Sequence, residues 1–260
     1  MIHLAPLPGS PRFSDSFDAV LERAVAEAAL LRELHVDGIL VENFGDVPFH
    51  KETVPPVTVA AMTRAVVEIR GALFGSEIPV GVNVLRNDAA SAISIAAASG
   101  ASFIRVNVHI GASVTDQGVI EGRADETLRL RARIAPDCAI LADLRVKHAR
   151  PLVERPVEEE VADLLERGLA DVLLVTGVRT GSAPEESELE RARTAARGAP
   201  VWIASGLDAE NGARLRGLAD GFIVGSALKR RGRATEPIDP TLARAVIAAL
   251  RSPERGASRD

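Results

Sequence analysis

The residues best suited to do chemistry occupy every second position of a short apolar segment. Arg105, Asn107 and His109 alternate with aliphatic residues between positions 103 and 109. Side chains of a β-strand alternate between its two faces, so these three polar groups would share one face. Because the aliphatic face must pack against neighbouring elements, the polar face is predicted to point into the space that the strands enclose.

A second segment repeats this pattern. Asp143, Arg145 and Lys147 would share a face by the same rule, and His148 follows directly. A buried Lys147 beside a histidine or arginine would have a lowered pKa and could act as a base or form a Schiff base. Pairing with Asp143 would instead keep the lysine charged, and both alternatives stay open. We assign Lys147, Asp143 and His109 as candidate catalytic residues.

Other strand-like segments end in single polar side chains. Glu42, Asn83 and Thr176 add a carboxylate, an amide and a hydroxyl, and Glu42 joins the candidate catalytic residues. The candidate substrate-binding residues are Asn83, Arg105, Asn107, His148 and Thr176. The alternative is an interior ion network, such as Arg105 with Asp143 or Glu42, that only fills space. For the whole group ligand binding is favoured, because aliphatic side chains would fill the interior at lower cost.

No cofactor is firmly implied by the sequence, and a divalent metal is a minor alternative. Glu42, His109 and Asp143 at neighbouring strand ends would offer carboxylate oxygens and an imidazole. This donor set suits Zn²⁺, Mn²⁺ or Fe²⁺. No closely spaced ligand motif supports the site.

Small residues follow the last two strand-like segments. Ser205 and Gly206 precede a short helical pattern, and Gly225 and Ser226 end the chain's last strand-like segment. Glycines let backbone N–H groups approach an anion, and barrels often bind phosphate at their seventh and eighth loops. These four residues are the candidate phosphate site, to which Lys229 could add charge. Glycine and serine are also ordinary at strand exits.

The elements that must position these residues form one repeated unit. Eight short apolar segments alternate with stretches of helical periodicity. The segments are residues 2–4, 37–43, 79–85, 103–109, 139–146, 171–177, 200–206 and 221–228. Eight such units in this length predict an α/β protein with a closed (β/α)₈ TIM barrel. An open doubly wound sheet is the alternative, but no glycine-rich dinucleotide turn follows the first segment.

The barrel is predicted to be a single domain at residues 1–250, followed by a polar tail at 251–260. The chain starts at its first strand, so a preceding barrel cap is expected to be absent. Ser14 and Asp15 are predicted to cap the first helix, and residues 124–134 give the weakest helical pattern.

Three connections are longer than ordinary strand–helix loops. They span residues 43–56, 110–123 and 148–155. Long loops on the rim of a barrel usually carry lids or binding groups. Asp46, Lys51, Asp116 and Glu121 are candidates on these loops, although charged loop residues are usually just solvated.

The composition excludes several classes of protein. The 260 residues carry a net charge of −5 and 3% aromatics, which does not favour nucleic-acid binding. The basic run at 229–233 is predicted to be a solvated turn. The single Cys138 excludes an internal disulfide and a cysteine-based zinc cage.

The chain also lacks the patterns of membrane insertion and secretion. No apolar run reaches the length of a membrane span, and no signal peptide is present. We expect a cytoplasmic homo-oligomer, with peripheral membrane attachment still open.

Several long motifs resemble the BtpA/SgcQ family over essentially the whole chain. They are MIHLAPLPGSP (1–11), VENFGDVP (41–48), GVNVLRND (81–88), FIRVNVH (103–109), TDQGVIEG (115–122), DLRVKHARPL (143–152) and VTGVRTG (175–181). The resemblance implies a barrel related to the ribulose-phosphate-binding barrels and a phosphorylated small-molecule ligand. It also implies a role in photosystem I biogenesis at the membrane in cyanobacteria, whereas other members are labelled nucleosidases or isomerases. No catalytic residue can be carried over from it.

Two hypotheses from different classes follow. The first is an enzyme acting on a sugar phosphate or nucleotide-derived substrate by proton transfer, as an isomerase, lyase or nucleosidase. The second is a non-catalytic assembly factor for a membrane complex, whose expected mark is an apolar surface patch. The enzyme is favoured because an assembly factor has no need of a polar barrel mouth.

Overall fold

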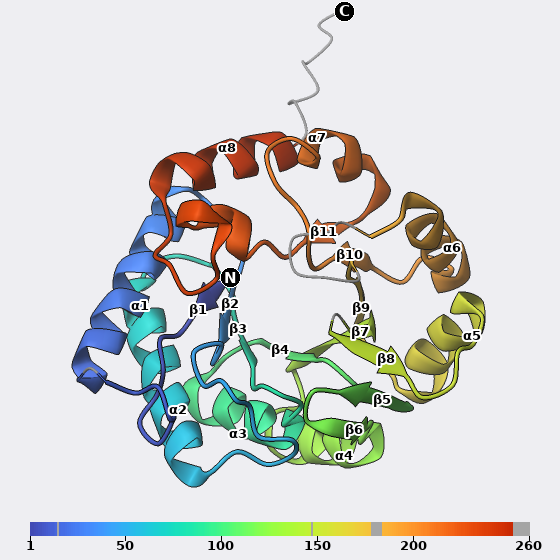
Figure 1. Cartoon of the computed structure of the whole chain (residues 1–260), viewed down its shortest axis with the longest axis horizontal. Helices are drawn as coiled ribbons and strands as arrows, with labels where there is room; N and C mark the ends of the chain where they lie inside the picture. The colour runs from blue at the N-terminus through green and yellow to red at the C-terminus, as the bar shows by residue number, and fades with distance from the viewer. Residues whose placement is uncertain (15, 147, 178–183, 252–260) are drawn as a thin grey trace, which may run out of the picture.

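Parallel strands form a ring at the centre of the molecule, and helices lie outside it (Figure 1). This computed structural model describes residues 1–14, 16–146, 148–177 and 184–251. In ring order the strands are β1 (Ile2–His3), β2 (Ile39–Glu42), β3 (Val80–Asn83), β4 (Phe103–Val106), β7 (Ala139–Arg145), β9 (Val172–Val175), β10 (Val201–Ile203) and β11 (Gly221–Phe222). Neighbouring strands in this order pair in parallel.

Helices alternate with the strands along the described chain. They are α1 (Phe17–Glu33), α2 (Pro56–Ala72), α3 (Ala89–Ser99), α4 (Ala124–Ile134), α5 (Val157–Ala162), α6 (Glu186–Ala196), α7 (Gly212–Leu215) and α8 (Pro240–Leu250). A π-helical turn, η1 (Asp163–Arg167), extends α5, and 3₁₀ turns are η2 (Arg216–Leu218), η3 (Ser226–Leu228) and η4 (Arg230–Gly232). The fold is a (β/α)₈ TIM barrel, as the repeated unit predicted.

The ring closes between its first and last units through contacts other than a strand ladder. The amino nitrogen of Met1 donates to the carbonyl oxygen of Val224 at 2.8 Å, just beyond β11. Lys229 on the following turn is fully buried, and its Nζ lies 3.8 Å from Oε2 of Glu27 on α1. The last strand is shorter than predicted because Gly225 leaves the extended conformation, with ψ −88°, and the chain turns into η3.

Apolar side chains fill the interior of the ring below its polar end. The cluster comprises Leu40, Leu141, Val172, Leu174, Ala204 and Ile223, with Met1, Phe103, Ala139 and Trp202 packed against it. Two glycines make room for the large rings. A Cβ on Gly81 would lie 2.1 Å from the Phe103 ring, and one on Gly221 would lie 2.5 Å from the Trp202 ring. Two residues beyond Leu40 the same face of β2 carries Glu42, so apolar filling gives way to polar groups toward the strand ends.

Between the ring and the helices, larger apolar clusters form the main core. Helix α1 begins after Ser16, whose Oγ accepts a hydrogen bond from the N–H of Ala19, and not after Ser14. The predicted cap Asp15 lies outside the described residues. Helix α4 buries only Thr127, which agrees with its weak apolar pattern.

A second, smaller sheet follows the ends of β4 and β7. Its strands pair antiparallel in the order β6 (Gly118–Glu121), β5 (Ala112–Thr115) and β8 (Ala149–Pro151). The long connections expected at 110–123 and 148–155 therefore contain three strands that the sequence did not predict. Val108, Ile120 and Val146 pack together as a small core against this sheet.

Candidate functional site

A buried ion pair stands at the C-terminal end of the barrel strands. Nε and Nη2 of Arg105 donate to the two carboxylate oxygens of Asp143 at 3.0 and 3.1 Å. Nδ2 of Asn107 donates to the same carboxylate at 2.8 Å. Burial alone would lower the pKa of Arg105, but Asp143 raises it above its ordinary value. The guanidinium therefore stays charged, and the Arg105–Asp143 pair that the ion-network alternative named is present.

Asn83 extends this network from β3. Its Nδ2 donates to the carbonyl oxygen of Arg105 at 3.1 Å and lies 3.5 Å from Oδ1 of Asn107. Its own Oδ1 is buried and has no hydrogen-bond partner among the described residues. An unpaired buried acceptor is costly, so this oxygen is suited to accept a hydrogen bond from a ligand hydroxyl.

Glu42 and Arg86 bring further charge to the same end of the barrel. Oε2 of Glu42 lies 3.6 Å from Nε2 of His3 on β1. Arg86 follows β3 and is buried; this burial lowers its pKa, while the charges of Asp116, Asp143 and Glu42 oppose the shift. Sequence reasoning missed Arg86 because it lies beyond the strand, although it stands within the motif GVNVLRND.

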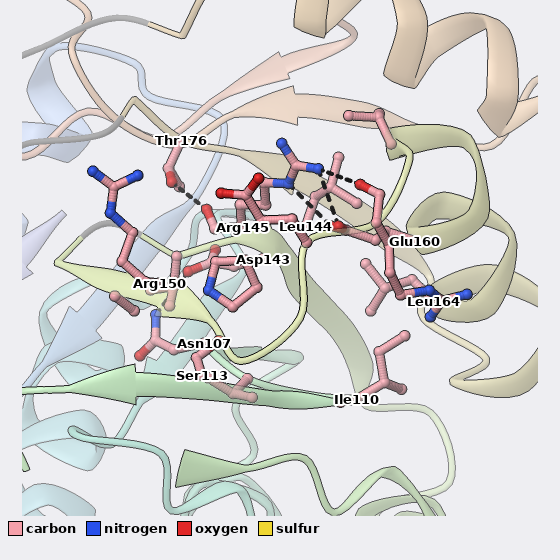
Figure 2. A pocket seen from close by; sticks show the side chains of 18 of the residues that line it. Asn107, Ile110, Ser113, Asp143, Leu144, Arg145, Arg150, Glu160, Leu164 and Thr176 are labelled. Carbon is pink, nitrogen blue, oxygen red and sulfur yellow. Dashed lines mark hydrogen bonds and ion pairs between the residues drawn. The ribbon is translucent and has the colours of Figure 1, made fainter. Parts of the chain in front are cut away.

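A bulge in β7 separates Asp143 from Arg145. The pairing of β7 with β9 shifts between these residues, so Arg145 turns toward the helices. Its guanidinium donates to Glu160 on α5 at 3.0 and 3.1 Å and to Glu188 on α6 at 3.0 Å. The expectation that Asp143 and Arg145 share a face is wrong. The carbonyl oxygen of Arg145 accepts a hydrogen bond from Oγ1 of Thr176 (Figure 2).

Two more of the predicted residues lie just beyond β7. Lys147 lies outside the described residues, so its role as a base stays a prediction. His148 is exposed and has a φ of +59°. It lines the cavity described below.

His109 turns away from the ion pair. Strand β4 ends at Val106, and Nε2 of His109 lies 2.7 Å from the carbonyl oxygen of Gly168 at the end of η1. Burial lowers the pKa of His109, and the Gly168 carbonyl opposes that shift. The neutral ring can donate from Nε2 to Gly168. His109 thus anchors the segment after β4 against the end of η1.

The three suggested metal ligands do not come together. Glu42 faces His3, Asp143 faces Arg105, and His109 faces Gly168. In the parts of the chain that the structure describes, no three histidine, cysteine or acidic side chains gather as an ion would require. The geometry does not support the ligand set of Glu42, His109 and Asp143.

The four candidate phosphate-binding residues lie after β10 and β11. Oγ of Ser205 accepts a hydrogen bond from the N–H of Gly177 at 2.8 Å. Gly206 has a φ of +73°. A Cβ on Gly225 would lie 3.0 Å from the His3 ring, and Ser226 begins η3.

Buried side chains that sequence reasoning undervalued hold the surrounding loops. Oδ1 of Asn43 accepts from the backbone just after β3 at 2.7 Å, and its Nδ2 donates to Asp46 at 3.1 Å. Asp46 also accepts from the backbone of the loop after β1 at 2.8 Å; burial raises the pKa of Asp46, and these hydrogen bonds oppose the shift. The side-chain amide of Asn87 both donates to and accepts from the backbone of Val108. Asp46 is a loop anchor here.

A cavity of about 950 Å³ opens beside the ion pair. Asn107, Asp143 and Thr176 line it from the barrel, while β5, β8, α5 and α6 supply the other walls (Figure 2). Its volume lies near the upper end of the range for small-molecule sites, about 300–1,000 Å³. Three polar groups of the barrel, Asn107, Asp143 and Thr176, therefore border a space that a ligand can enter.

The arrangement suits proton transfer on a polar ligand. Asp143 already accepts three hydrogen bonds, so it fixes Arg105 and Asn107 in place. Glu42 is another buried carboxylate at this end of the barrel. Arg105 and Arg86 could stabilise negative charge that develops on the ligand.

A family model and the sequences of known proteins both match this chain and indicate the same family. The family model described as "BtpA family" matches residues 1–252. The photosystem I biogenesis protein BtpA of Synechocystis sp. is 50% identical over 250 residues, which cover 96% of this chain and 86% of that protein. An uncharacterized protein of Pyrococcus furiosus is 42% identical over 247 residues, which cover 95% of this chain and 92% of that protein.

Solved structures with the same fold include TIM-barrel enzymes. N-(5'-phosphoribosyl)anthranilate isomerase from Pyrococcus furiosus superposes with a TM-score of 0.54 at 18% identity, covering 88% of this chain and 94% of that one. Orotidine 5'-phosphate decarboxylase from Pyrococcus horikoshii superposes with a TM-score of 0.54 at 14% identity, covering 97% of this chain and 100% of that one. At such identities the similarity shows the barrel fold alone.

Proposed function

This chain belongs to the BtpA family, and on that premise we propose that it is an enzyme of acid/base chemistry. Its substrate would be a phosphorylated sugar or a nucleotide-derived small molecule, and its reaction an isomerisation, a lyase-type cleavage or a nucleoside cleavage. The observation that carries the proposal is the buried polar cluster around Arg105 and Asp143 beside a cavity of about 950 Å³. Aliphatic side chains would fill the barrel more cheaply if nothing had to bind there.

The solved barrels of similar fold support the class of ligand. Their names refer to a phosphoribosyl anthranilate and to orotidine 5'-phosphate, which are both ribose phosphates. In this chain Ser205, Gly206, Gly225 and Ser226 would bind the phosphate through backbone N–H groups and hydroxyls.

The remaining residues take roles according to their geometry. Glu42 would move the proton, with His3 at 3.6 Å holding its carboxylate. Asp143 would orient Arg105 and Asn107, and Asn83 would accept a hydrogen bond from a substrate hydroxyl. Lys147 is kept in the proposal as a second acid/base group. His109 is left out of the proposal, because its ring contacts the carbonyl oxygen of Gly168.

The test begins with binding and ends with turnover. A thermal-shift screen of phosphorylated sugars and nucleotides should raise the melting temperature, and NMR should then show conversion of the best binder. Glu42→Gln should retain binding while lowering kcat by about 100-fold or more, because a positioned general base contributes about 10²–10⁴-fold. Glu68→Gln, at an exposed ion pair on α2, is the matched control. If no phosphorylated compound shifts the melting temperature, or if Glu42→Gln turns over at the normal rate, the proposal is wrong.

A non-catalytic role in assembling a membrane complex is the second candidate. The 50% identical relative is named a photosystem I biogenesis protein. Exposed apolar side chains occur on and beside the small sheet, namely Val114, Val119, Leu152 and Val153, at 45, 37, 59 and 69% exposure. The described helices include none with the length and hydropathy of a membrane span. This role predicts that the protein pellets with membranes, that Val153→Glu abolishes pelleting, and that no metabolite binds.

A further inference from the structure

We propose that the β8 wall of the cavity is a second anion subsite, in which Arg150 binds a phosphate or carboxylate group of the substrate. The other anionic group of the same molecule would occupy the loops after β10 and β11. This inference rests on the proposed function and narrows its substrate class to small molecules with two anionic groups.

The backbone of Arg150 is held by the small sheet. Arg150 lies in β8, opposite Val114 of the central strand β5. Its side chain lines the cavity, as do Asn107 and Thr176 at the barrel end (Figure 2). A guanidinium that starts from a hydrogen-bonded strand has fewer conformations to lose on binding than one on a free loop.

Charge pairing around the cavity sets Arg150 apart. Of the described residues, four arginines line it, and three of them form ion pairs within the protein itself. Arg145 pairs with Glu160 and Glu188, Arg155 with Asp163 and Glu159, and Arg191 with Glu158. The side chain of Arg150 makes no hydrogen bond or ion pair with any residue that the structure describes.

The described acidic residues that line the cavity form no ion pair with Arg150. Glu154 and Glu185 also line the cavity. The charge of Glu154 acts on Arg145, and neither carboxylate forms an ion pair with a described arginine. Arg150 is exposed at the β8 wall, so its guanidinium can pair with a ligand without first breaking an ion pair of the described chain.

The chemistry and size of the space suit such a ligand. A guanidinium presents a planar fork of donors that matches phosphate and carboxylate groups. Ser113 on β5 is half-buried, lines the same cavity and offers a hydroxyl donor. About 950 Å³ is more than a sugar monophosphate needs, so there is room for a second charged group.

Three probes test the subsite by calorimetry. Ribose 5-phosphate carries one anionic group, ribulose 1,5-bisphosphate carries two phosphates, and 6-phosphogluconate carries a phosphate and a carboxylate. At least one two-anion probe should bind about tenfold more tightly than ribose 5-phosphate, and which one does so distinguishes phosphate from carboxylate at Arg150. Arg150→Gln should remove this advantage without changing the affinity for ribose 5-phosphate. Arg150→Lys should retain part of it, because the charge remains but the planar fork is lost.

The control is Arg133→Gln, which changes an exposed arginine in the last turn of α4 that likewise makes no ion pair in the described chain. It should leave all three affinities unchanged. If ribose 5-phosphate binds but neither two-anion probe binds more tightly, the second subsite is wrong and the proposed function stands. The same holds if Arg150→Gln keeps the full advantage. If no probe binds at all, the proposed function and this inference fall together.

Discussion

Asp143 orders the barrel mouth at the residue scale, because its carboxylate accepts hydrogen bonds from two nitrogens of Arg105 and from Asn107. The alternation of strand side chains was enough to predict this convergence, since a period of two holds wherever the backbone stays extended. It failed for His109, beyond the end of β4, and for Arg145, beyond the β7 bulge. Neither the end of β4 nor the bulge in β7 changes the alternation of apolar residues in the sequence, so the pattern could not reveal them.

Asp143→Asn should strongly destabilise the fold. It leaves the guanidinium of Arg105 buried without a counter-charge, which costs about 3–5 kcal/mol. Replacing both partners, by Arg105→Met with Asp143→Leu, should recover most of that loss, because an apolar pair needs no compensation. Urea unfolding of the single and double variants measures the difference.

The exposed pair Arg64–Glu68 on α2 is the reference for this experiment. Glu68→Gln should change the free energy of unfolding by about 1 kcal/mol or less. A similarly small effect of Asp143→Asn on the free energy of unfolding would contradict this prediction, because it would show that Arg105 does not depend on Asp143 as its counter-charge.

At the scale of elements, the strand–helix repeat was readable because each strand is apolar on the face that meets the helices. The hairpin of β5 and β6 was not recognised, since its strands have only four residues each and lie within a segment interpreted as a long loop. One signal was present in the sequence. Asp116 and Gln117 connect Thr115 to its partner Gly118, which has a φ of +92°, and short polar turns with glycine are typical of hairpins.

Strand β3 depends on the absence of a side chain at Gly81. A Cβ there would meet the Phe103 ring at 2.1 Å, so Gly81→Ala should cost about 1–3 kcal/mol through overpacking. Adding Phe103→Leu should restore part of the stability, because the shorter side chain vacates the contact. Thermal unfolding of the two variants and their combination gives the coupling between the positions.

Gly71 provides the opposite expectation in the last turn of α2. A Cβ there meets nothing within 4 Å, so Gly71→Ala should stabilise the protein by up to about 1 kcal/mol. If Gly81→Ala behaved like Gly71→Ala, the interior of the barrel would not be packed as the structure has it.

At the scale of the whole molecule, the sequence predicted a closed ring but not the contacts that close it. Strands β1 and β11 have two residues each, and the Lys229–Glu27 pair joins the last unit to the first helix. The run 229–233 was expected to be a solvated turn, yet Lys229 is fully buried. Composition alone cannot show which member of a charged run turns inward, because that depends on an acid brought near by the fold.

The Lys229–Glu27 closure predicts a specific dependence of stability on pH. Burial lowers the pKa of Lys229 to about 8, and the charge of Glu27 opposes the shift. An unfolded lysine titrates near its ordinary pKa of about 10.4. Above about pH 8 the unfolded chain therefore binds more protons at this site than the folded one, and the free energy of unfolding rises with pH. Between about pH 8 and pH 9 we expect a rise of about 1 kcal/mol relative to Lys229→Met.

Urea unfolding at several pH values between these limits measures the slope, and Lys51→Met is the control because Lys51 is exposed on a loop. Two other buried groups also titrate differently in the folded and unfolded chains near these pH values. Burial lowers the pKa of the Met1 amino group to about 5, which raises stability with pH, and raises the pKa of Cys138 to about 11, which lowers it. Both groups are common to all three chains, so the difference between the chains isolates the lysine. Lys51→Met should keep the slope of the natural chain, while Lys229→Met should lose the part that Lys229 contributes. Equal slopes for the natural chain and Lys229→Met would mean that Lys229 holds its proton as an exposed lysine does, and that the ring is closed without a desolvated pair.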